Sequence, residues 1–123
     1  MKVNIITPDK TVYSNEANSV IIPGSEGDLG LLENHSPIIC SLRPGLILIY
    51  KDDKCLKKIF VNDGILEFSE NNAIILTENA TDIDGINSQD IKDNIKKYED
   101  VGNEQLAKIE KNKLFSIENQ FYN

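Results

Sequence analysis

Short runs of apolar and β-branched residues alternate with turn-forming residues through the first two thirds of the sequence. Such runs, repeated about every 8 to 12 residues and separated by Gly, Pro, Asn or Asp, are typical of strands in an antiparallel sandwich or barrel. No helical period of about 3.6 residues appears in this part. We expect strands at 3–5, 19–22, 46–50, 55–61, 65–68 and 73–77.

Towards the C-terminus the apolar residues follow a helical period instead. Asn87 is suited to cap a first helix, with Asp90 at its third position as in a capping box. A Gly-Asn pair interrupts this pattern, and a second helix is expected from Glu104. The apolar stripes are Ile91, Ile95 and Tyr98 on the first helix, and Leu106, Ile109, Leu114, Ile117 and Phe121 on the second. We therefore expect an N-terminal antiparallel β-sandwich over 1–82 and a C-terminal antiparallel two-helix hairpin over 83–123.

The composition limits the classes of partner. The chain has 123 residues, 40% of them hydrophobic and 27% charged, with a formal net charge of −7. An acidic chain argues against binding to nucleic acid or to an anionic membrane surface, since both need a basic face. No run approaches the ~20 apolar residues of a membrane-spanning helix, and the N-terminus has no apolar signal core. We expect a soluble protein that meets a membrane only through another protein.

Few side chains in the sequence are suited to catalysis or metal binding. His35 is the only histidine and both cysteines are isolated, so we expect reduced thiols and no metal site. Cys40 and His35 lack a third group to orient a nucleophile and its base. Glu26, Asp28 and Glu33 could supply a carboxylate pair, but a solvated acidic loop is the favoured interpretation. We expect no catalytic residue and no cofactor.

The segment 23–37, PGSEGDLGLLENHSP, concentrates three of the seven glycines and the histidine. Its glycine spacing is neither the dinucleotide fingerprint nor a P-loop, and its acids would repel a phosphate. We interpret the glycines as turn-forming residues of a loop that presents Glu26 and Asp28 outward, to a basic protein surface.

In this segment, P-G-S-E-G-D-L-G followed by N-H-S-P closely resembles the epsilon subunit of the F-type ATP synthase. Four further stretches resemble the same family in order: Ile5 to Pro8, Leu42 to Gly45, Asn62 to Glu67, and Ala73 to Ala80. The resemblance covers about residues 1–82, and the helical tail matches by architecture only.

The resemblance implies a ten-stranded β-sandwich, a two-helix hairpin and a non-catalytic role. In that family the sandwich binds the gamma subunit and stands on the loops of the c-ring in the rotating central stalk, so that rotation reaches the catalytic head. The implied location is peripheral, on the cytoplasmic side of the bacterial inner membrane, with an organellar equivalent as the alternative.

Matching positions imply two contact surfaces. The residues implied to face the c-ring loops are Glu26, Asp28, Leu31 and Leu32. His35 and Cys40 are implied to lie at or near gamma. For His35, a turn histidine bonded to the backbone is the alternative.

The tail departs from the family. Many relatives begin the first tail helix with an (I/L)-D-x-x-R-A motif that is associated in some with ATP binding; here its positions are Ile86, Asn87, Asp90 and Ile91. An aspartate in place of the arginine removes the cation that would face phosphate, so we expect no ATP binding. Basic residues of the second helix are offset by acids. We therefore expect a hairpin packed on the sandwich, with inhibition of the alpha and beta catalytic head as the alternative.

Two functions of other classes stay open on the residues alone. One is a small β-sandwich ligand-binding module with a helical dimerisation hairpin, which purification with or without gamma would distinguish. The other is a hydrolase that uses Glu26 and Asp28, whose activity would be lost when both are mutated.

Overall fold

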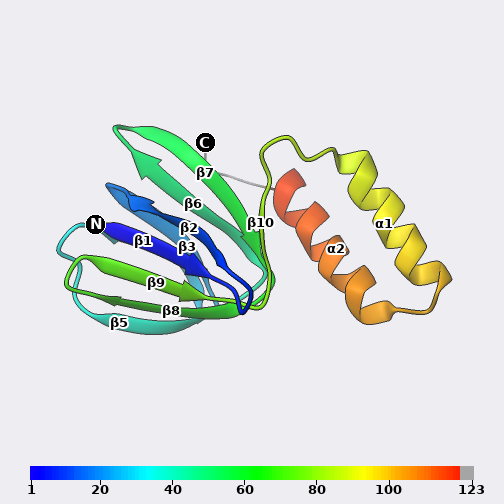
Figure 1. The fold of residues 1–123 in the computed structure, drawn as a ribbon, viewed down its shortest axis with the longest axis horizontal. Helices are drawn as coiled ribbons and strands as arrows, with labels where there is room; N and C mark the ends of the chain where they lie inside the picture. Colours follow the sequence, from blue (N-terminus) through cyan, green and yellow to red (C-terminus); the bar gives the residue numbers. More distant parts are fainter. Residues whose placement is uncertain (120–123) are drawn as a thin grey trace.

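Ten strands and two helices follow one another along residues 1–119, the part of the chain that this computed structural model describes (Figure 1). The strands are β1 (Lys2–Ile6), β2 (Thr11–Glu16), β3 (Ser19–Gly24), β4 (Gly27–Leu32), β5 (Ile38–Leu42), β6 (Gly45–Lys51), β7 (Lys54–Val61), β8 (Gly64–Ser69), β9 (Asn72–Leu76) and β10 (Ala80–Asp82). The helices are α1 (Ser88–Asp100) and α2 (Glu104–Glu118). The architecture is therefore a β-sandwich followed by a two-helix hairpin, as the sequence predicts.

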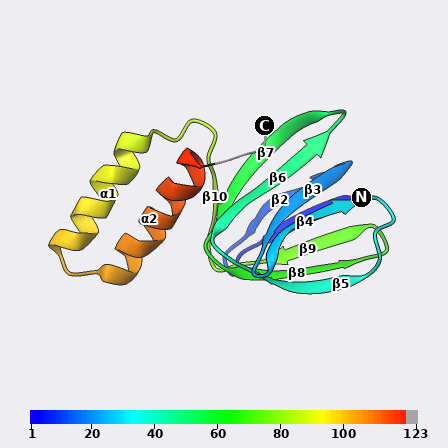
Figure 2. The ribbon, with the colours of Figure 1, turned by 180° about the vertical axis from the view of Figure 1, so that it is seen from behind.

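The strands form one continuous sheet that curls into two layers (Figures 1 and 2). The order is β10-β7-β6-β3-β5-β8-β9-β1-β2, and β4 pairs with β3 outside this path. Neighbouring strands are antiparallel except for β1 and β9, which are parallel. The prediction of an antiparallel sandwich is thus correct except for this one pair, which joins the beginning of the sandwich to its end.

Six strands lie within one or two residues of their predicted bounds, and two tight turns define the facing ends of four of them. Asp52 and Asp53 between β6 and β7 both have positive φ, as do Glu70 and Asn71 between β8 and β9. Two consecutive residues of this kind form the type I′ turn, whose twist matches that of a hairpin. Four strands were not predicted: β2, β4, β5 and β10.

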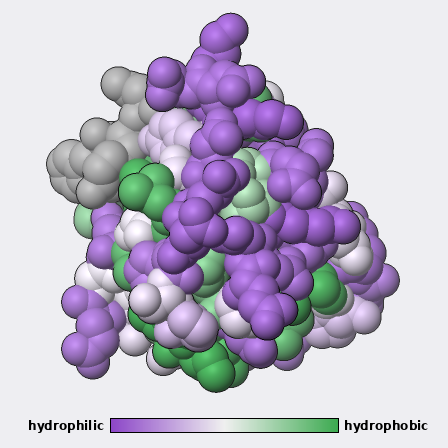
Figure 3. All heavy atoms as spheres, turned by 90° about the vertical axis from the view of Figure 1, so that its left-hand side faces the viewer, coloured by the Kyte–Doolittle hydropathy of each residue, from purple (hydrophilic) through white to green (hydrophobic). Residues whose placement is uncertain are grey.

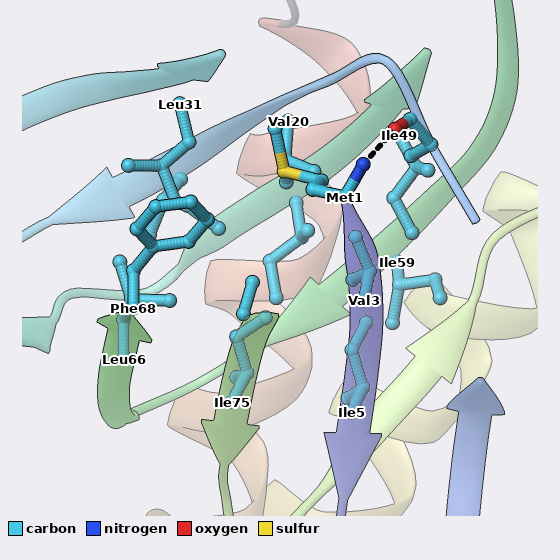
Figure 4. Packing of buried hydrophobic residues seen from close by; sticks show 14 of the residues in the cluster. Met1, Val3, Ile5, Val20, Leu31, Ile49, Ile59, Leu66, Phe68 and Ile75 are labelled. Atoms are coloured by element: carbon cyan, nitrogen blue, oxygen red, sulfur yellow. Dashed lines mark hydrogen bonds between the residues drawn. The ribbon is translucent and has the colours of Figure 1, made fainter. Parts of the chain in front are cut away.

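Alternate side chains of the strands meet between the two layers. Val3 and Ile5 of β1, Ile49 of β6 and Phe68 of β8 are buried in one apolar cluster. Figure 4 shows side chains from β1, β8 and β9 meeting others from β3, β6 and β7 there. Because the cluster consists largely of Ile, Leu and Val, packing of branched aliphatic side chains supplies most of the stability of the sandwich.

Asparagine side chains cap both helices of the hairpin. Asn87 accepts a hydrogen bond from the Gln89 amide at 2.7 Å, and Asn103 accepts one from the Leu106 amide at 3.1 Å. The buried side chains of the helices are Ile91 on α1 and Ala107 on α2. The predicted stripe of the second helix omitted Ala107 and included Leu106, which is 39% exposed, and Phe121, which lies outside the described residues.

The hairpin packs on the outer side of β6 and β7 (Figures 1 and 2). Phe60 points away from the sandwich core, because its neighbours Ile59 and Val61 point into it, yet Phe60 is buried. The Lys113 ammonium of α2 lies 5.9 Å from its ring centroid. The Asn112 amide of α2 also donates to the side-chain oxygen of Asn62 at 3.1 Å. The expectation of a hairpin packed on the sandwich describes this structure.

A lysine fixes the chain between the two parts. Lys57 Nζ on β7 lies 2.7 Å from Asp82 Oδ2 on β10 and 3.8 Å from Asp84 Oδ2 in the connection to α1. The hydrogen bond to Asp82 raises the pKa of Lys57. Partial burial disfavours the charged form of Asp82, but the bonds from Lys57 and the Asp84 amide outweigh it and lower the pKa of Asp82. Both groups are therefore charged near neutral pH.

Replacing Phe60 tests the docking of the hairpin. Phe60→Ala removes a buried ring between β7 and α2, and truncations of this kind cost about 3 to 5 kcal/mol. We expect amide hydrogen exchange in α1 and α2 to accelerate at least tenfold while exchange in β8 and β9 changes much less. Leu56→Ala is the matched control, since Leu56 lies on the same strand but is 42% exposed. Unchanged helix exchange in Phe60→Ala would contradict this account.

Candidate functional site

The segment expected to be a loop is a hairpin of β3 and β4. The chain turns at 24–27, and Gly27 has φ +131, a conformation that disfavours a side chain. A Cβ at Gly24 would lie 2.6 Å from the Gly27 carbonyl oxygen, so both positions require glycine, whereas Gly30 has open space around it. The loop interpretation is wrong for Gly27–Leu32, which form a strand because they pair with β3 along its whole length.

The three acids of this segment have different surroundings. Asp28 Oδ1 lies 2.5 Å from Arg43 Nη2, and Arg43 Nη1 donates to the Gly24 carbonyl at 2.6 Å. Glu33 Oε1 lies 3.0 Å from the amino group of Met1. Glu26 is exposed at the turn. These separate arrangements do not favour an acid–base pair; they fit a shaped, charged hairpin tip.

The two leucines of β4 have opposite environments. Leu31 is 0% exposed and belongs to the core cluster, whereas Leu32 is 65% exposed. Successive side chains of a strand point to opposite faces, so only one of them is available at the surface. The prediction that Leu31 contacts a partner is wrong for this reason.

Leu32 and the hairpin tip lie at opposite ends of β4. Five steps separate Gly27 from Leu32, and at about 3.4 Å per residue they span about 17 Å. A partner that touches Glu26 would therefore need a broad surface to touch Leu32 as well. The four residues expected at one contact are thus distributed over the tip, the core and the far end of the strand.

The turn that carries His35 is held by several contacts. Asn34 and Asn71 exchange hydrogen bonds, from the Asn34 amide to Asn71 Oδ1 and from Asn71 Nδ2 to Asn34 Oδ1. His35 Nδ1 lies 2.7 Å from the Ser36 carbonyl oxygen, to which it can only donate. The imidazole also meets the Phe68 ring edge to face, with centroids 5.9 Å apart. These contacts agree with the backbone-bonded alternative for His35, and the contact with gamma stays a prediction.

Cys40 and its neighbour Ile39 lie on opposite faces of β5. Cys40 pairs with the buried Leu66 of β8 and packs against the core, and this burial raises the pKa of its thiol. Ile39 points outward and is 72% exposed. A partner on this side of the sheet would therefore touch Ile39 rather than the Cys40 side chain. Alternation along β5 would have identified Ile39 from the sequence had this strand been predicted.

Ile39 belongs to an apolar surface that the sequence analysis missed. Ile65 on β8 and Leu76 on β9 are 52% and 51% exposed, and they lie side by side because Ile65 pairs with Leu76, which pairs with Ile6 of β1. We call the outward-facing residues Ile6, Ile39, Ile65, Ile74 and Leu76 the outer face. The exposed Glu67 of β8 lies between Ile39 and Ile74 on this face, so the contiguous apolar part is centred on Ile65 and Leu76. Large apolar side chains exposed side by side in this way are typical of a surface that another protein covers.

The surroundings of the outer face are polar. Figure 3 shows that the end of the sandwich opposite the hairpin is mostly hydrophilic, with apolar atoms along its lower edge, the side of β5 and β8. A groove lies at the other end of the outer face, between Pro8, Asp63 and Glu78. The apolar part around Ile65 and Leu76 thus has polar and acidic surroundings, which is the usual organisation of a protein–protein interface.

The residues at the position of the ATP-associated motif begin helix α1. Asn87 caps the helix, Ile91 is buried and Asp90 is exposed. Ile86 precedes them and donates its amide to the Ile83 carbonyl at 3.1 Å. The segment therefore has a structural role, and the expected lack of ATP binding stays a prediction.

The described residues, 1–119, contain neither a metal-ligating cluster nor a membrane-spanning helix. Within that range no group of three or more His, Cys, Asp or Glu side chains is placed to hold a metal ion. None of the helices there is long and apolar enough to cross a bilayer.

Together, the fold, the outer face and the charged tip define a small β-sandwich protein with a docked helical hairpin and surfaces suited to other macromolecules. Residues 1–83 match the family model of the ATP synthase delta/epsilon chain, β-sandwich domain. The chain belongs to this family.

Curated relatives support the same assignment. The ATP synthase epsilon chain of Sulfurimonas denitrificans is 41% identical over 85 residues, which are 69% of this chain and 65% of the relative. The epsilon chain of Rhodospirillum rubrum is 27% identical over 107 residues, 87% of this chain and 80% of the relative. The match to the Sulfurimonas chain thus spans slightly less than two thirds of that protein.

Solved structures show the same fold. A chain in the Euglena gracilis mitochondrial ATP synthase, in an OSCP/F1/c-ring structure, has a TM-score of 0.75 at 14% identity, covering 94% of this chain and 78% of that one. A chain in the central stalk/c-ring structure of the Tetrahymena thermophila mitochondrial ATP synthase has a TM-score of 0.57, also at 14% identity, covering 74% and 69%. At this identity the likeness concerns the fold alone.

The two leucines of β4 provide a stability test. We expect Leu31→Ala to lower the free energy of unfolding by about 2 to 5 kcal/mol, because it leaves a cavity in the core. Leu32→Ala should change it by less than about 0.5 kcal/mol, as for most surface substitutions. Urea unfolding of both variants measures the difference. Equal effects would mean that the alternation along β4 is misassigned.

Proposed function

We propose that the protein is the epsilon subunit of an F-type ATP synthase, a non-catalytic part of the central stalk. In this role it binds the gamma subunit and the c-ring, and couples rotation of the ring to the catalytic head. The proposal is carried by the outer face, an uncovered apolar surface on a chain of the delta/epsilon family. It also accounts for the lack of an acid–base pair in the acidic segment.

The outer face is the proposed contact for gamma. Burial of a large aliphatic side chain contributes about 1.5 to 3 kcal/mol, and a few such residues near the centre of an interface carry most of its affinity. Ile65 and Leu76 meet this requirement because they are paired neighbours, and Ile39 lies diagonal to Ile65 on the next strand; all three are at least half exposed. His35 would lie at the margin, on the turn before β5.

The tip of the β3–β4 hairpin is the proposed contact for the c-ring. It carries Glu26 and Asp28 on a tight, glycine-shaped turn, so a cationic or amide group of a partner can approach both the acids and the backbone. An exposed ion pair contributes only about 0 to 1 kcal/mol. The tip would therefore orient the subunit on the ring, while the outer face supplies the affinity for the stalk.

The helical hairpin is proposed to stay docked on the sandwich and stabilise it, and not to inhibit the catalytic head. Lys111 lies 3.3 Å from Glu99 of α1, and Lys113 lies 3.2 Å from Glu110 on its own helix. Two of the three lysines of α2 are thus engaged within the hairpin, which leaves little basic surface to meet an acidic segment of the alpha and beta subunits. Docking through Phe60 and Asn112 also favours a hairpin that stays on the sandwich.

The proposed location follows from these partners. A subunit that binds gamma and the c-ring loops lies at the cytoplasmic side of the bacterial inner membrane, as a peripheral part of the complex. The net charge of −7 is consistent with attachment through proteins rather than through anionic lipids.

Charged substitutions on the outer face test the gamma contact. We expect the double variant Ile39→Asp, Ile65→Asp to bind isolated gamma at least 100-fold more weakly, because two carboxylates would be buried at an apolar interface. Its unfolding midpoint should change little, since both positions are exposed. Leu56→Asp is the control, as Leu56 is exposed on β7, away from the outer face. Wild-type affinity in the double variant would refute this assignment of the surface.

The hairpin is tested by ATP hydrolysis with a catalytic head that lacks epsilon. The full chain and a chain that ends at Ile86 are added in turn, and both must bind gamma equally, which shows that the shortened sandwich is folded. We expect equal rates of hydrolysis with the two chains. Slower hydrolysis with the full chain alone would make the hairpin an inhibitory element in spite of its internal ion pairs.

A further inference from the structure

Arg43 holds the tip of the β3–β4 hairpin from outside that hairpin. Its guanidinium donates to the Gly24 carbonyl at 2.6 Å and contacts Asp28 Oδ1 at 2.5 Å. Its backbone amide donates to the Pro23 carbonyl at 2.9 Å. A single residue between β5 and β6 therefore binds the end of β3 and the beginning of β4 at the same time.

The preceding residues of β5 reinforce this contact. The Ser25 amide donates to the Ser41 carbonyl at 2.9 Å, and the two serine hydroxyls lie 3.4 Å apart. Gly24 is also paired with Leu42. The turn at 24–27 thus has three attachments to the end of β5 in addition to its own β3–β4 pairing.

The same contact divides the charges of the tip unequally. The Arg43 guanidinium compensates Asp28, whose side chain is 38% exposed. No hydrogen bond or ion pair joins Glu26 to another residue within 1–119. Of the two acids, Glu26 is therefore the one with an uncompensated carboxylate for a partner.

We propose that Arg43 is a positioning residue for the c-ring contact: it fixes the hairpin tip and neutralises Asp28, so that Glu26 is the acid that meets a cationic group of the ring. This inference rests on the proposed function. It differs from the expectation that Glu26 and Asp28 both contact the ring, because here the Asp28 carboxylate is already paired with Arg43.

A positioning role and a purely electrostatic role of Arg43 predict opposite changes in affinity for the ring when this residue is replaced. Removing the guanidinium leaves the tip with two uncompensated acids, so a purely electrostatic role predicts tighter binding to a cationic partner. A positioning role predicts weaker binding, because the tip must then be ordered when the ring binds. Arg43→Lys keeps the positive charge but loses the planar fork that reaches Gly24 and Asp28 together.

The experiment measures binding of the complex of gamma and the full chain to purified c-ring, with the variants Arg43→Lys, Arg43→Gln and Glu26→Gln. We expect about a tenfold loss of affinity for both Arg43 variants, comparable to one lost charge-assisted hydrogen bond. Glu26→Gln should lose affinity and also weaken the salt dependence of binding. Asp53→Asn is the control, since Asp53 is an exposed acid of the β6–β7 turn.

Amide hydrogen exchange provides a readout that does not need the ring. In Arg43→Lys the Ser25 and Gly27 amides should exchange at least tenfold faster, with gamma affinity unchanged. Wild-type ring affinity or tip exchange in Arg43→Lys, or tighter binding by Arg43→Gln, would overturn the proposal. If the wild-type complex itself does not bind the ring, the proposed function fails at the c-ring and the inference fails with it. Normal wild-type binding with unaffected Arg43 variants would reject the inference alone.

Discussion

The burial of alternate side chains between two layers of one curled sheet is the constraint on which the rest of this structure depends. Val3, Ile49 and Phe68 point inward. The residues that alternate with them along each strand must therefore point outward, on both sides of the sandwich. The chain covers one side itself, by laying α2 over Phe60 on β7. The other side, the outer face, stays uncovered. A surface for a partner is thus a direct consequence of how the core is filled.

The parts of the fold that could be predicted from the sequence are those with a strong local signal. The runs at β6 and β7 are long and β-branched, and their Asp-Asp turn has a conformation that defines a hairpin. Asn87 and Asn103 mark helix starts by a side chain that can replace a missing backbone partner. In each of these cases the residues that decide the structure are neighbours in the sequence.

Three of the four missed strands lack such a signal. β2 is a polar strand at the edge of the sheet, β4 contains two glycines, and β10 has three residues. They are strands because a partner strand is present, which a single sequence does not reveal. The errors in the candidate site follow from this. Without β4 and β5 there was no alternation to separate Leu31 from Leu32, or Cys40 from Ile39, although the segment itself was correctly identified as distinctive.

The parallel pairing of β1 with β9 has a consequence for how the chain folds. Lys2 pairs with Asn72 and Ile6 with Leu76, so the first strand acquires one of its two neighbours only when nearly two thirds of the chain is available. A contact so distant in sequence is slow to form, because a long loop must close before the pairing stabilises it. During synthesis, β1 and β2 would remain an isolated hairpin, with Val3 and Ile5 exposed to water, until β8 and β9 arrive. Completion of the sandwich is therefore a late event, and the apolar first strand is the segment most exposed to misassociation before it.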